Sequence, residues 1–230
     1  MTDKHLLTRE LIEAGGVDAI VARDAPGLRL LTDAERAASL RAVLDVRPPG
    51  DVWLFGYGSL IWNPTIRSVE HRTARIEGWH RAFCLSIRAG RGSMENPGLM
   101  LALDAGGDCS GVAFRIAEEE LEAELALLWR REMLAGSYVP RWIDALDHRG
   151  ARFGSAIAFT IDPAGEQYAG RLAQEIVVQR LATASGALGS AAEYLFRTRD
   201  GLRAHGIPDP ELERLAASVE AAQALGAGED

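Results

Sequence analysis

Cysteine is scarce in this sequence. Cys84 and Cys109 are the only two in 230 residues, and neither belongs to a CxxC pair or to a Cys/His cluster with metal-ligand spacing. The sequence therefore predicts neither a disulfide framework nor a structural zinc site. Both cysteines stand in apolar, strand-like surroundings, which is typical of inert core thiols. Such a chain suits a reducing compartment, and we expect it in the cytoplasm.

Long apolar runs and an excess of positive charge are also absent. No window approaches the roughly 18 uninterrupted apolar residues of a membrane span, and the start, MTDKHLLTRELIEAGG, lacks the apolar region of a signal peptide. Lys and Arg number 25 against 33 Asp and Glu, which gives a net charge of −8. A nucleic-acid surface is basic and clustered. We therefore expect no membrane, no nucleic acid and no protein partner, and the 47% of hydrophobic residues is enough for a globular core.

The usual signatures of covalent, metal and nucleotide chemistry are missing. None of the five histidines stands in an HExxH or comparable arrangement, so no metal site is predicted. The glycine-rich stretch GYGS at 56–59 fits neither GxxxxGK nor GxGxxG, so no phosphate-bearing cofactor is predicted. Ser59 is not in the G-x-S-x-G elbow of serine hydrolases, because the second glycine precedes it.

The first 50 residues differ in pattern from the rest. Residues 1–45 are amphipathic and helical in character, with Thr32 and Glu35 predicting a helix start before RAASLRAVL. The Pro-Pro-Gly stretch at 48–50 closes this arm. We expect residues 1–50 to be a helical extension packed on the main domain. A separate interaction module is the weaker alternative, because 45 residues hardly build an independent core.

From residue 52 the pattern changes to short apolar runs separated by Gly, Asn and Pro. These runs predict strands at 52–56, 73–78, 81–87, 99–103, 110–116 and 152–160. Helices are expected at 118–134, 168–184, 190–205 and 209–224. The fold class is therefore α+β, with a largely antiparallel sheet or barrel. The stretch at 88–98 is too rich in Gly, Asn and Pro for regular structure, and is either a functional loop or a plain surface hairpin.

The stretch DVWLFGYGSLIW at 51–62 places two glycines and a serine directly after an apolar strand. Gly56 and Gly58 permit close approaches that a Cβ forbids, so successive amide N–H groups can point at one anion. Ser59 adds a hydroxyl donor. A tight bulge in a packed strand explains the same residues equally well. The stretch alone leaves both alternatives open.

A carboxylate interrupts the apolar stripe of the helix expected at 118–134. Leu121, Leu125 and Leu128 step by four and three, and the next position of the stripe is Glu132. Burial would raise the pKa of Glu132 and leave a base able to take a proton near neutral pH. Alternatively, Glu132 faces water near the helix end and pairs with a neighbouring arginine: Arg130, Arg131 or Arg141. Periodicity does not decide between the two.

The sequence that follows Glu132, MLAGSYVPRW, is the second unusual feature of this region. It ends the helix at Gly136 and brings Tyr138, Arg141 and Trp142 close behind. Such side chains are suited to lining a pocket.

Together these segments resemble the ChaC family of glutathione-specific gamma-glutamylcyclotransferases, most closely its bacterial members. The similar segments are VWLFGYGSLIWNP (52–64), RAFCLSIRAGRGSMENPGLMLALDAGGDCSGVAFRI (81–116), LLWRREMLAGSYVPRW (127–142) and LATASGALGSAAEYLFRTRDGLRAHGIPDPELERL (181–215). The resemblance implies a gamma-glutamylcyclotransferase-like fold, a mainly antiparallel or mixed barrel flanked by helices, with 51–230 as the catalytic domain. It implies a lyase that converts reduced glutathione to 5-oxoproline and cysteinylglycine by internal attack, without a cofactor.

The resemblance also implies roles for individual residues. The family's YGSL motif matches 57–60, and the loop around it is implied to hold the gamma-glutamyl group: Phe55, Gly56, Tyr57, Gly58, Ser59 and Leu60. The catalytic glutamate, carried in an RE(x)nGxY context, matches Glu132 and is implied to accept and return a proton. The tyrosine of the family's EYL stretch matches Tyr194, which is placed near the substrate. Residues 1–45 inherit no role.

Two alternatives remain open. A cyclotransferase for other gamma-glutamyl amino acids or amines would share these residues and differ only in the pocket for the leaving group. A non-catalytic carboxylate-binding module needs no carboxylate on a buried stripe, so Glu132 counts against it. Within 88–98, Arg88 or Arg91 is a candidate partner for the glycyl carboxylate of glutathione, although both also fit the pattern of solvated surface arginines.

Overall fold

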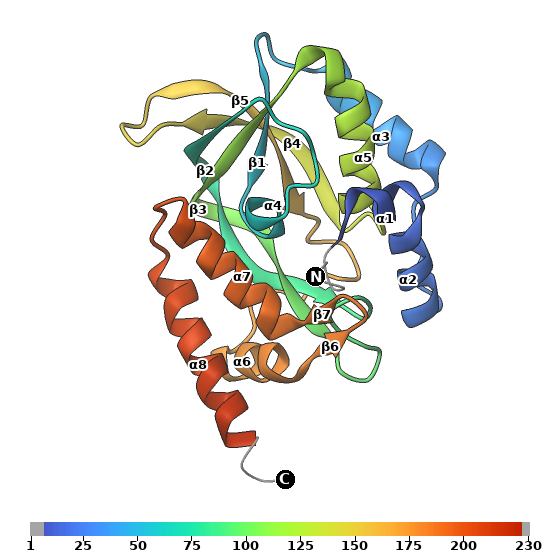
Figure 1. Ribbon diagram of the computed structural model, residues 1–230, viewed down its shortest axis with the longest axis vertical. Helices are drawn as coiled ribbons and strands as arrows, with labels where there is room; N and C mark the ends of the chain where they lie inside the picture. The colour runs from blue at the N-terminus through green and yellow to red at the C-terminus, as the bar shows by residue number, and fades with distance from the viewer. Residues whose placement is uncertain (1–6, 227–230) are drawn as a thin grey trace.

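A closed barrel forms the centre of the protein, whose computed structural model describes residues 7–226 (Figure 1). Its strands follow the order β1-β3-β2-β4-β5 and comprise β1 (Val52–Gly56), β2 (Glu70–Ile87), β3 (Gly98–Ile116), β4 (Tyr138–Leu146) and β5 (Arg152–Ile161). The pairs are antiparallel except for those of β5 with β1 and with β3, which are parallel. The barrel is therefore mixed, and the expected α+β class is confirmed.

Strand β1 is buried along its whole length. All five of its residues are buried, and it pairs with β3 along one edge and with β5 along the other. A strand covered on both faces is a continuous apolar run, as VWLFG is. The strand ends at Gly56, and the short helix α4 (Ser59–Trp62) begins two residues after Tyr57. The GYGS stretch is therefore the turn that carries the chain from the barrel into α4.

Helices cover the barrel in two groups (Figure 1). Helix α5 (Leu121–Glu132) follows a 3-10 turn at Glu118–Glu120 and lies beside the N-terminal arm. Three C-terminal helices pack against one another on the other side: α6 (Gln174–Thr183), α7 (Ala191–Ala204) and α8 (Pro210–Gly226). A small hairpin, β6 (Ser185–Gly186) with β7 (Gly189–Ser190), joins α6 to α7.

The N-terminal arm contains α1 (Arg9–Glu13), α2 (Gly16–Asp24) and α3 (Asp33–Asp45). The predicted start of α3 is confirmed, since Thr32 and Glu35 form a reciprocal capping box. Two indole groups of the main domain donate to α3: Trp129 Nε1 lies 3.2 Å from Ser39 Oγ, and Trp142 Nε1 lies 2.8 Å from the carbonyl oxygen of Val43.

Several expected boundaries were wrong. The runs at 73–78 and 81–87 belong to one strand, β2, because Gly78 (φ +82°) marks a register shift rather than a strand end. The runs at 99–103 and 110–116 likewise both lie in β3. Helix α6 begins at Gln174 and not at 168, because the backbone of 168–169 pairs with β2. Strand β4 was missed altogether, since its residues were interpreted as pocket-lining side chains after a helix.

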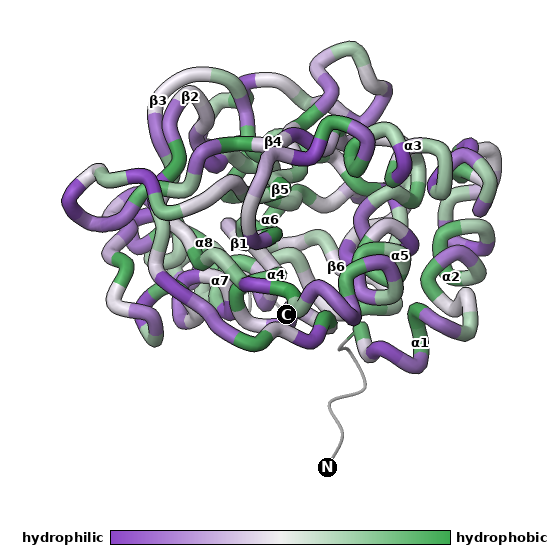
Figure 2. The backbone as a smooth tube through the Cα atoms, turned by 90° about the horizontal axis from the view of Figure 1, so that it is seen from above, coloured by the Kyte–Doolittle hydropathy of each residue, from purple (hydrophilic) through white to green (hydrophobic). Residues whose placement is uncertain are grey.

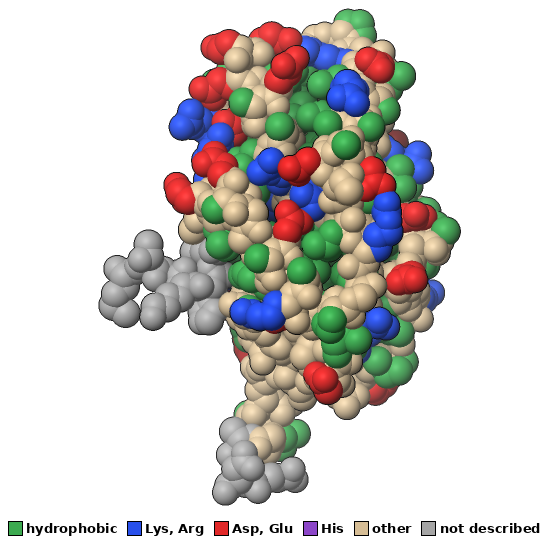
Figure 3. Space-filling model, turned by 90° about the vertical axis from the view of Figure 1, so that its right-hand side faces the viewer, with side chains coloured by type: hydrophobic (Ala, Val, Ile, Leu, Met, Phe, Trp, Pro, Cys, Tyr) green, Lys and Arg blue, Asp and Glu red, His purple; other side chains and the backbone are tan. Residues whose placement is uncertain are grey.

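Polar residues occupy the turns and the outer surface. The turn between β4 and β5, at the left of Figures 1 and 2, is hydrophilic. Acidic and basic side chains are interspersed on the face shown in Figure 3. Within residues 7–226 no helix is long and apolar enough to cross a bilayer. The same residues include no group of three or more His, Cys, Asp or Glu side chains placed to hold a metal ion. Cys84 and Cys109 are buried free thiols.

Candidate active site

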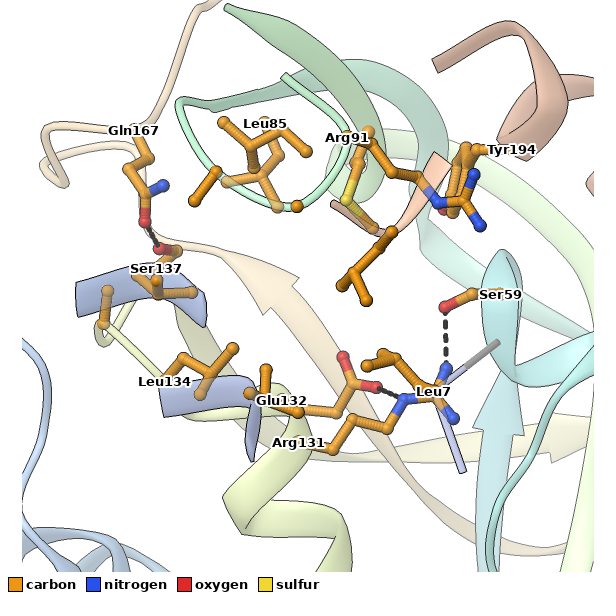
Figure 4. Close-up of a pocket in the computed structure, with 18 of the residues that line it drawn as sticks. Leu7, Ser59, Leu85, Arg91, Arg131, Glu132, Leu134, Ser137, Gln167 and Tyr194 are labelled. Atoms are coloured by element: carbon orange, nitrogen blue, oxygen red, sulfur yellow. Dashed lines mark hydrogen bonds and ion pairs between the residues drawn. The ribbon is translucent and has the colours of Figure 1, made fainter. Parts of the chain in front are cut away.

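A cavity of ≈ 160 Å³ lies beside the end of α5 (Figure 4). This is roughly ten times the minimum of about 10–15 Å³ that a single water needs on this measure, so the cavity admits a small organic group. Its wall is mostly apolar, and the polar side chains that reach it include Ser59, Arg131, Glu132, Tyr138 and Tyr194. An apolar pocket with a few placed polar groups is the usual form of a small-molecule site.

Glu132 is the last residue of α5 and points into this cavity. The stripe that precedes it is buried, with Leu125 and Leu128 wholly inaccessible, so the helix face that carries Glu132 turns inward. Its side chain is only 13% exposed. Burial raises the pKa of Glu132 above its ordinary value, and the adjacent Arg131 offsets this only in part. The arrangement gives a buried carboxyl group that can take up and return a proton.

Arg131 connects Glu132 to the GYGS turn. Nε of its buried guanidinium lies 2.9 Å from Glu132 Oε1, and Nη2 donates to Ser59 Oγ at 2.9 Å (Figure 4). Nη1 donates to Thr65 Oγ1 at 3.0 Å and to the carbonyl oxygen of Asn63. One arginine therefore fixes the end of α5 against the start of α4. Of the arginines considered as partners of Glu132, Arg131 is the one that pairs with it.

Gly58 makes room for a tyrosine. A Cβ at this position would lie 2.6 Å from Tyr194 Oη, a distance that carbon and oxygen do not tolerate without a shift. Tyr194 comes from α7 and is 2% exposed. Burial and the charge of Glu132 raise the pKa of Tyr194 to about 12, although hydrogen bonds from the backbone of Leu101 and Ser59 act against this. Tyr194 therefore stays protonated at neutral pH, at the edge of the cavity.

Two further phenols lie near Glu132. Burial raises the pKa of Tyr57 and of Tyr138 well above the ordinary value, and the charge of Glu132 raises both further. Tyr57 Oη donates to the carbonyl oxygen of Phe159 at 2.8 Å. Tyr138, at the start of β4, lines the cavity. Both phenols keep their protons at neutral pH, so the surroundings of Glu132 are rich in hydroxyl donors and poor in other acids.

The structure separates the residues that the sequence grouped together. Ser59, Glu132 and Tyr194 line the cavity, as does Tyr138. The other members of the 55–60 segment do not line the cavity. Phe55, Tyr57 and Leu60 are buried core residues, and Gly56 and Gly58 are buried as well. Whether they contact a substrate stays a prediction.

Two expectations about side chains near the cavity were wrong. Arg141 and Trp142 belong to β4 and do not line it, since Arg141 Nε donates to Thr160 Oγ1. Arg91 does line the cavity but is not a solvated surface residue, because it is 6% exposed and bonded to Glu193 Oε2 at 2.9 Å. Arg88 is exposed at the same wall and makes no ion pair with any residue from 7 to 226.

Sequence reasoning missed a polar pair at the far end of the cavity. Ser137 Oγ donates to Gln167 Oε1, and both residues line the wall (Figure 4). They lie in two loops, 30 positions apart in the chain. No local pattern joins them, because the barrel closure brings their loops together.

Comparisons with known proteins agree on one family. The family model described as ChaC-like protein matches residues 52–222. The glutathione-specific gamma-glutamylcyclotransferase of Escherichia coli is 48% identical over 193 residues, which cover 83% of this chain and 83% of that protein. The glutathione-specific gamma-glutamylcyclotransferase 1 of Homo sapiens is 31% identical over 180 residues, covering 75% and 79%.

A solved structure shares the fold. The crystal structure of a gamma-glutamyl cyclotransferase specific to glutathione from yeast superposes with a TM-score of 0.65, over 74% of this chain and 96% of that one. Its sequence identity is 21%. At that identity the likeness establishes the barrel and its helices.

Proposed function

The chain belongs to the ChaC-like protein family, and we propose that it is a glutathione-specific gamma-glutamylcyclotransferase, a lyase that converts reduced glutathione to 5-oxoproline and cysteinylglycine. The observation that carries the proposal is Glu132, a largely shielded carboxyl group with a raised pKa at the wall of a mostly apolar cavity. The 48% identity to the Escherichia coli enzyme supports glutathione as the substrate.

Glu132 performs both proton transfers in the proposed reaction. The free α-amine of the gamma-glutamyl group attacks its own γ-carbonyl carbon, and the new C–N bond closes a five-membered ring. Glu132 takes the proton that this nitrogen loses. It then delivers the proton to the leaving nitrogen as the original amide C–N bond breaks. Glu132 therefore ends in the protonation state in which it began, and no other co-reactant is consumed.

The rest of the site holds the substrate in a reactive shape. Ring closure is intramolecular, so fixing the folded conformation of the gamma-glutamyl chain supplies much of the rate enhancement. We propose that the turn formed by residues 55–60, together with Tyr194, binds the gamma-glutamyl group on the Ser59 side of Glu132. The hydroxyl of Ser59 and the protonated phenols of Tyr138 and Tyr194 are the donors available to its carboxylate and to the developing oxyanion.

The remaining proposals concern the chain as a whole. We take residues 51–230 as the catalytic domain and residues 1–50 as an extension of it. Glutathione is a small-molecule substrate, and we place its turnover in the cytoplasm, where the buried thiols Cys84 and Cys109 stay reduced.

The deciding experiment is incubation of the purified protein with reduced glutathione. We expect equimolar 5-oxoproline and cysteinylglycine, detected by mass spectrometry. Gamma-glutamyl-alanine and gamma-glutamyl-lysine serve as competing substrates. Faster release of 5-oxoproline from either one would replace glutathione by another gamma-glutamyl compound, and release from none of the three would reject a cyclotransferase.

The glycyl carboxylate needs a cationic partner, and Arg88 is the better candidate because Arg91 already pairs with Glu193. Replacement of Arg88 by Ala should raise the KM for glutathione and leave kcat unchanged. The same substitution at Arg91 should instead lower stability, because it leaves Glu193 without this partner.

A further inference from the structure

The N-terminal arm supplies part of the cavity wall. Val21, on α2, and Leu28, in the loop after it, are half-buried and line the cavity. Val17 and Leu7 of the same arm line it too. The family model matches only residues 52–222, so this part of the wall lies outside the matched region.

The arm is fixed to the two residues that follow Glu132. The buried guanidinium of Arg36 donates through Nε to the carbonyl oxygen of Met133 at 3.1 Å and pairs with Asp18 of α2. The amide of Leu31 donates to the carbonyl oxygen of Leu134 at 2.8 Å. The wall formed by the arm is therefore held at a set place relative to Glu132.

The wall residues around Glu132 fall into two groups. Figure 4 shows Ser59 and Tyr194 on one side of its carboxylate, and Leu134, Ser137 and Gln167 on the other. A single carboxylate that carries the proton from the α-amine to the leaving nitrogen must be within hydrogen-bond reach of both atoms, which are bonded to the same carbon during the reaction. With the gamma-glutamyl group on the Ser59 side, the part of the cavity left for the dipeptide lies toward Leu134, the residue to which the arm is bonded.

We propose that Val21 and Leu28 form the apolar side of the leaving-group subsite, where they contact the cysteinyl side chain and set selectivity between dipeptide leaving groups. This inference rests on the proposed function. The cysteinyl CH₂–SH group is small and largely apolar, and an aliphatic wall favours it over a leaving group that has no side chain. Apolar pocket residues commonly lower kcat/KM by about tenfold or more for a substrate that lacks one apolar group.

The test compares two substrates that differ only at this side chain, glutathione and gamma-glutamyl-glycyl-glycine. The variants are Val21→Ser, Leu28→Ser and the double substitution. We expect the double variant to lose roughly tenfold in kcat/KM for glutathione, mostly through KM, and less than threefold for the analogue. If the wild-type protein binds the analogue without cleaving it, the inhibition constant of the analogue replaces kcat/KM.

Val46→Ser is the matched control, because Val46 belongs to the same arm, is 69% exposed and does not line the cavity. It should leave both substrates unaffected. Equal losses for the two substrates, or no loss for glutathione, would overturn the proposal. If the serine variants fail to fold in a thermal scan, Val21→Thr keeps the side-chain shape and must still show the selective loss. A wild-type protein that releases no 5-oxoproline from glutathione would instead reject the proposed function itself.

Discussion

Helix α5 carries two glutamates with largely shielded side chains, Glu124 near its start and Glu132 at its end, about two turns apart. Burial acts to raise the pKa of both. At Glu124 this is outweighed, because Oε2 accepts from Arg9 Nη1 at 2.7 Å and from the amide of Arg67 at 2.9 Å, and the pKa is lowered. At Glu132 the pKa stays raised.

The two carboxylates differ in the number of donors, because Glu124 accepts from both Arg9 and the amide of Arg67, whereas Glu132 pairs with Arg131. Arg131, the neighbour of Glu132, divides its hydrogen bonds among Ser59, Thr65 and the carbonyl oxygen of Asn63. A carboxylate with two donors is held ionised and contributes to stability, whereas one with a single donor, whose pKa burial raises, remains free to exchange a proton. The two ends of one helix therefore have different tasks.

The largest expected effect separates the two glutamates by activity. Glu132→Gln should lower kcat by about 10²- to 10⁴-fold, because a general acid/base group is lost. Glutathione binding, measured by calorimetry, should change little. The thermal midpoint should not fall, because a raised folded-state pKa means that the ionised group costs stability at neutral pH. Retained turnover would end the assignment of Glu132 as the base.

The next effect separates them by stability. Glu124→Gln should lower the free energy of unfolding by about 1.5–3 kcal/mol, because it weakens two charge-assisted hydrogen bonds at a buried position. The activity of the folded fraction should stay near the wild-type value. The folded-state pKa of Glu124 is lowered, so its contribution is present above the unfolded value near 4.5 and is lost as pH falls through the folded value. Denaturant titrations at neutral and acidic pH measure this loss.

A smaller effect concerns the partner of Glu124. Arg9→Met should cost about 1 kcal/mol or less, because the Arg9 side chain is 24% exposed and Glu124 keeps the amide of Arg67 as a donor. Chemical denaturation of the variant beside Glu124→Gln provides the measurement. A cost as large as that of Glu124→Gln would mean that Arg9 alone stabilises the carboxylate.

The smallest effect is a shift in pH dependence. Activity requires ionised Glu132, so kcat/KM should fall as pH drops through its raised pKa. Arg131→Lys weakens the hydrogen bond that favours the ionised form of Glu132. The fall of kcat/KM at acidic pH should therefore move to higher pH by a fraction of a unit. Arg130→Lys is the control, because Arg130 pairs with Asp33 at 3.2 Å on the surface. If the fall in kcat/KM at low pH occurs at the same pH in the Arg131 variant, the titration behind it belongs to a group other than Glu132.

The sequence anticipated one of these glutamates and not the other. Glu132 could be found because it breaks an apolar stripe, and the stripe is a property of local periodicity. Glu124 carries no such signal, since its partners Arg9 and Arg67 are distant in sequence and meet it only in the folded chain. The same limit applies to Val21, whose place in the cavity wall depends on how the arm folds back on α5.

Strand ends and helix ends could be predicted where the residues that determine them are neighbours in the chain. The run VWLFG predicted both ends of β1, and Thr32 with Glu35 predicted the start of α3, because the determinants are adjacent in the chain. By contrast, the continuation of β2 through Gly78 and the formation of β4 from Tyr138 onward depend on pairing with distant strands. Local composition there resembles turns and pocket walls, and the barrel closure decides the outcome.

The close approach of Gly58 to Tyr194 has a consequence for sequence variation. A methyl group at position 58 would meet Tyr194 Oη at 2.6 Å but the ring carbon Cζ only at 3.8 Å. The obstacle is one oxygen atom, so the two positions are expected to vary together in descendants of this chain. Phenylalanine at 194 would remove this nearest contact, and the next neighbour of a Cβ at 58 would be Leu101 Cβ at 3.7 Å.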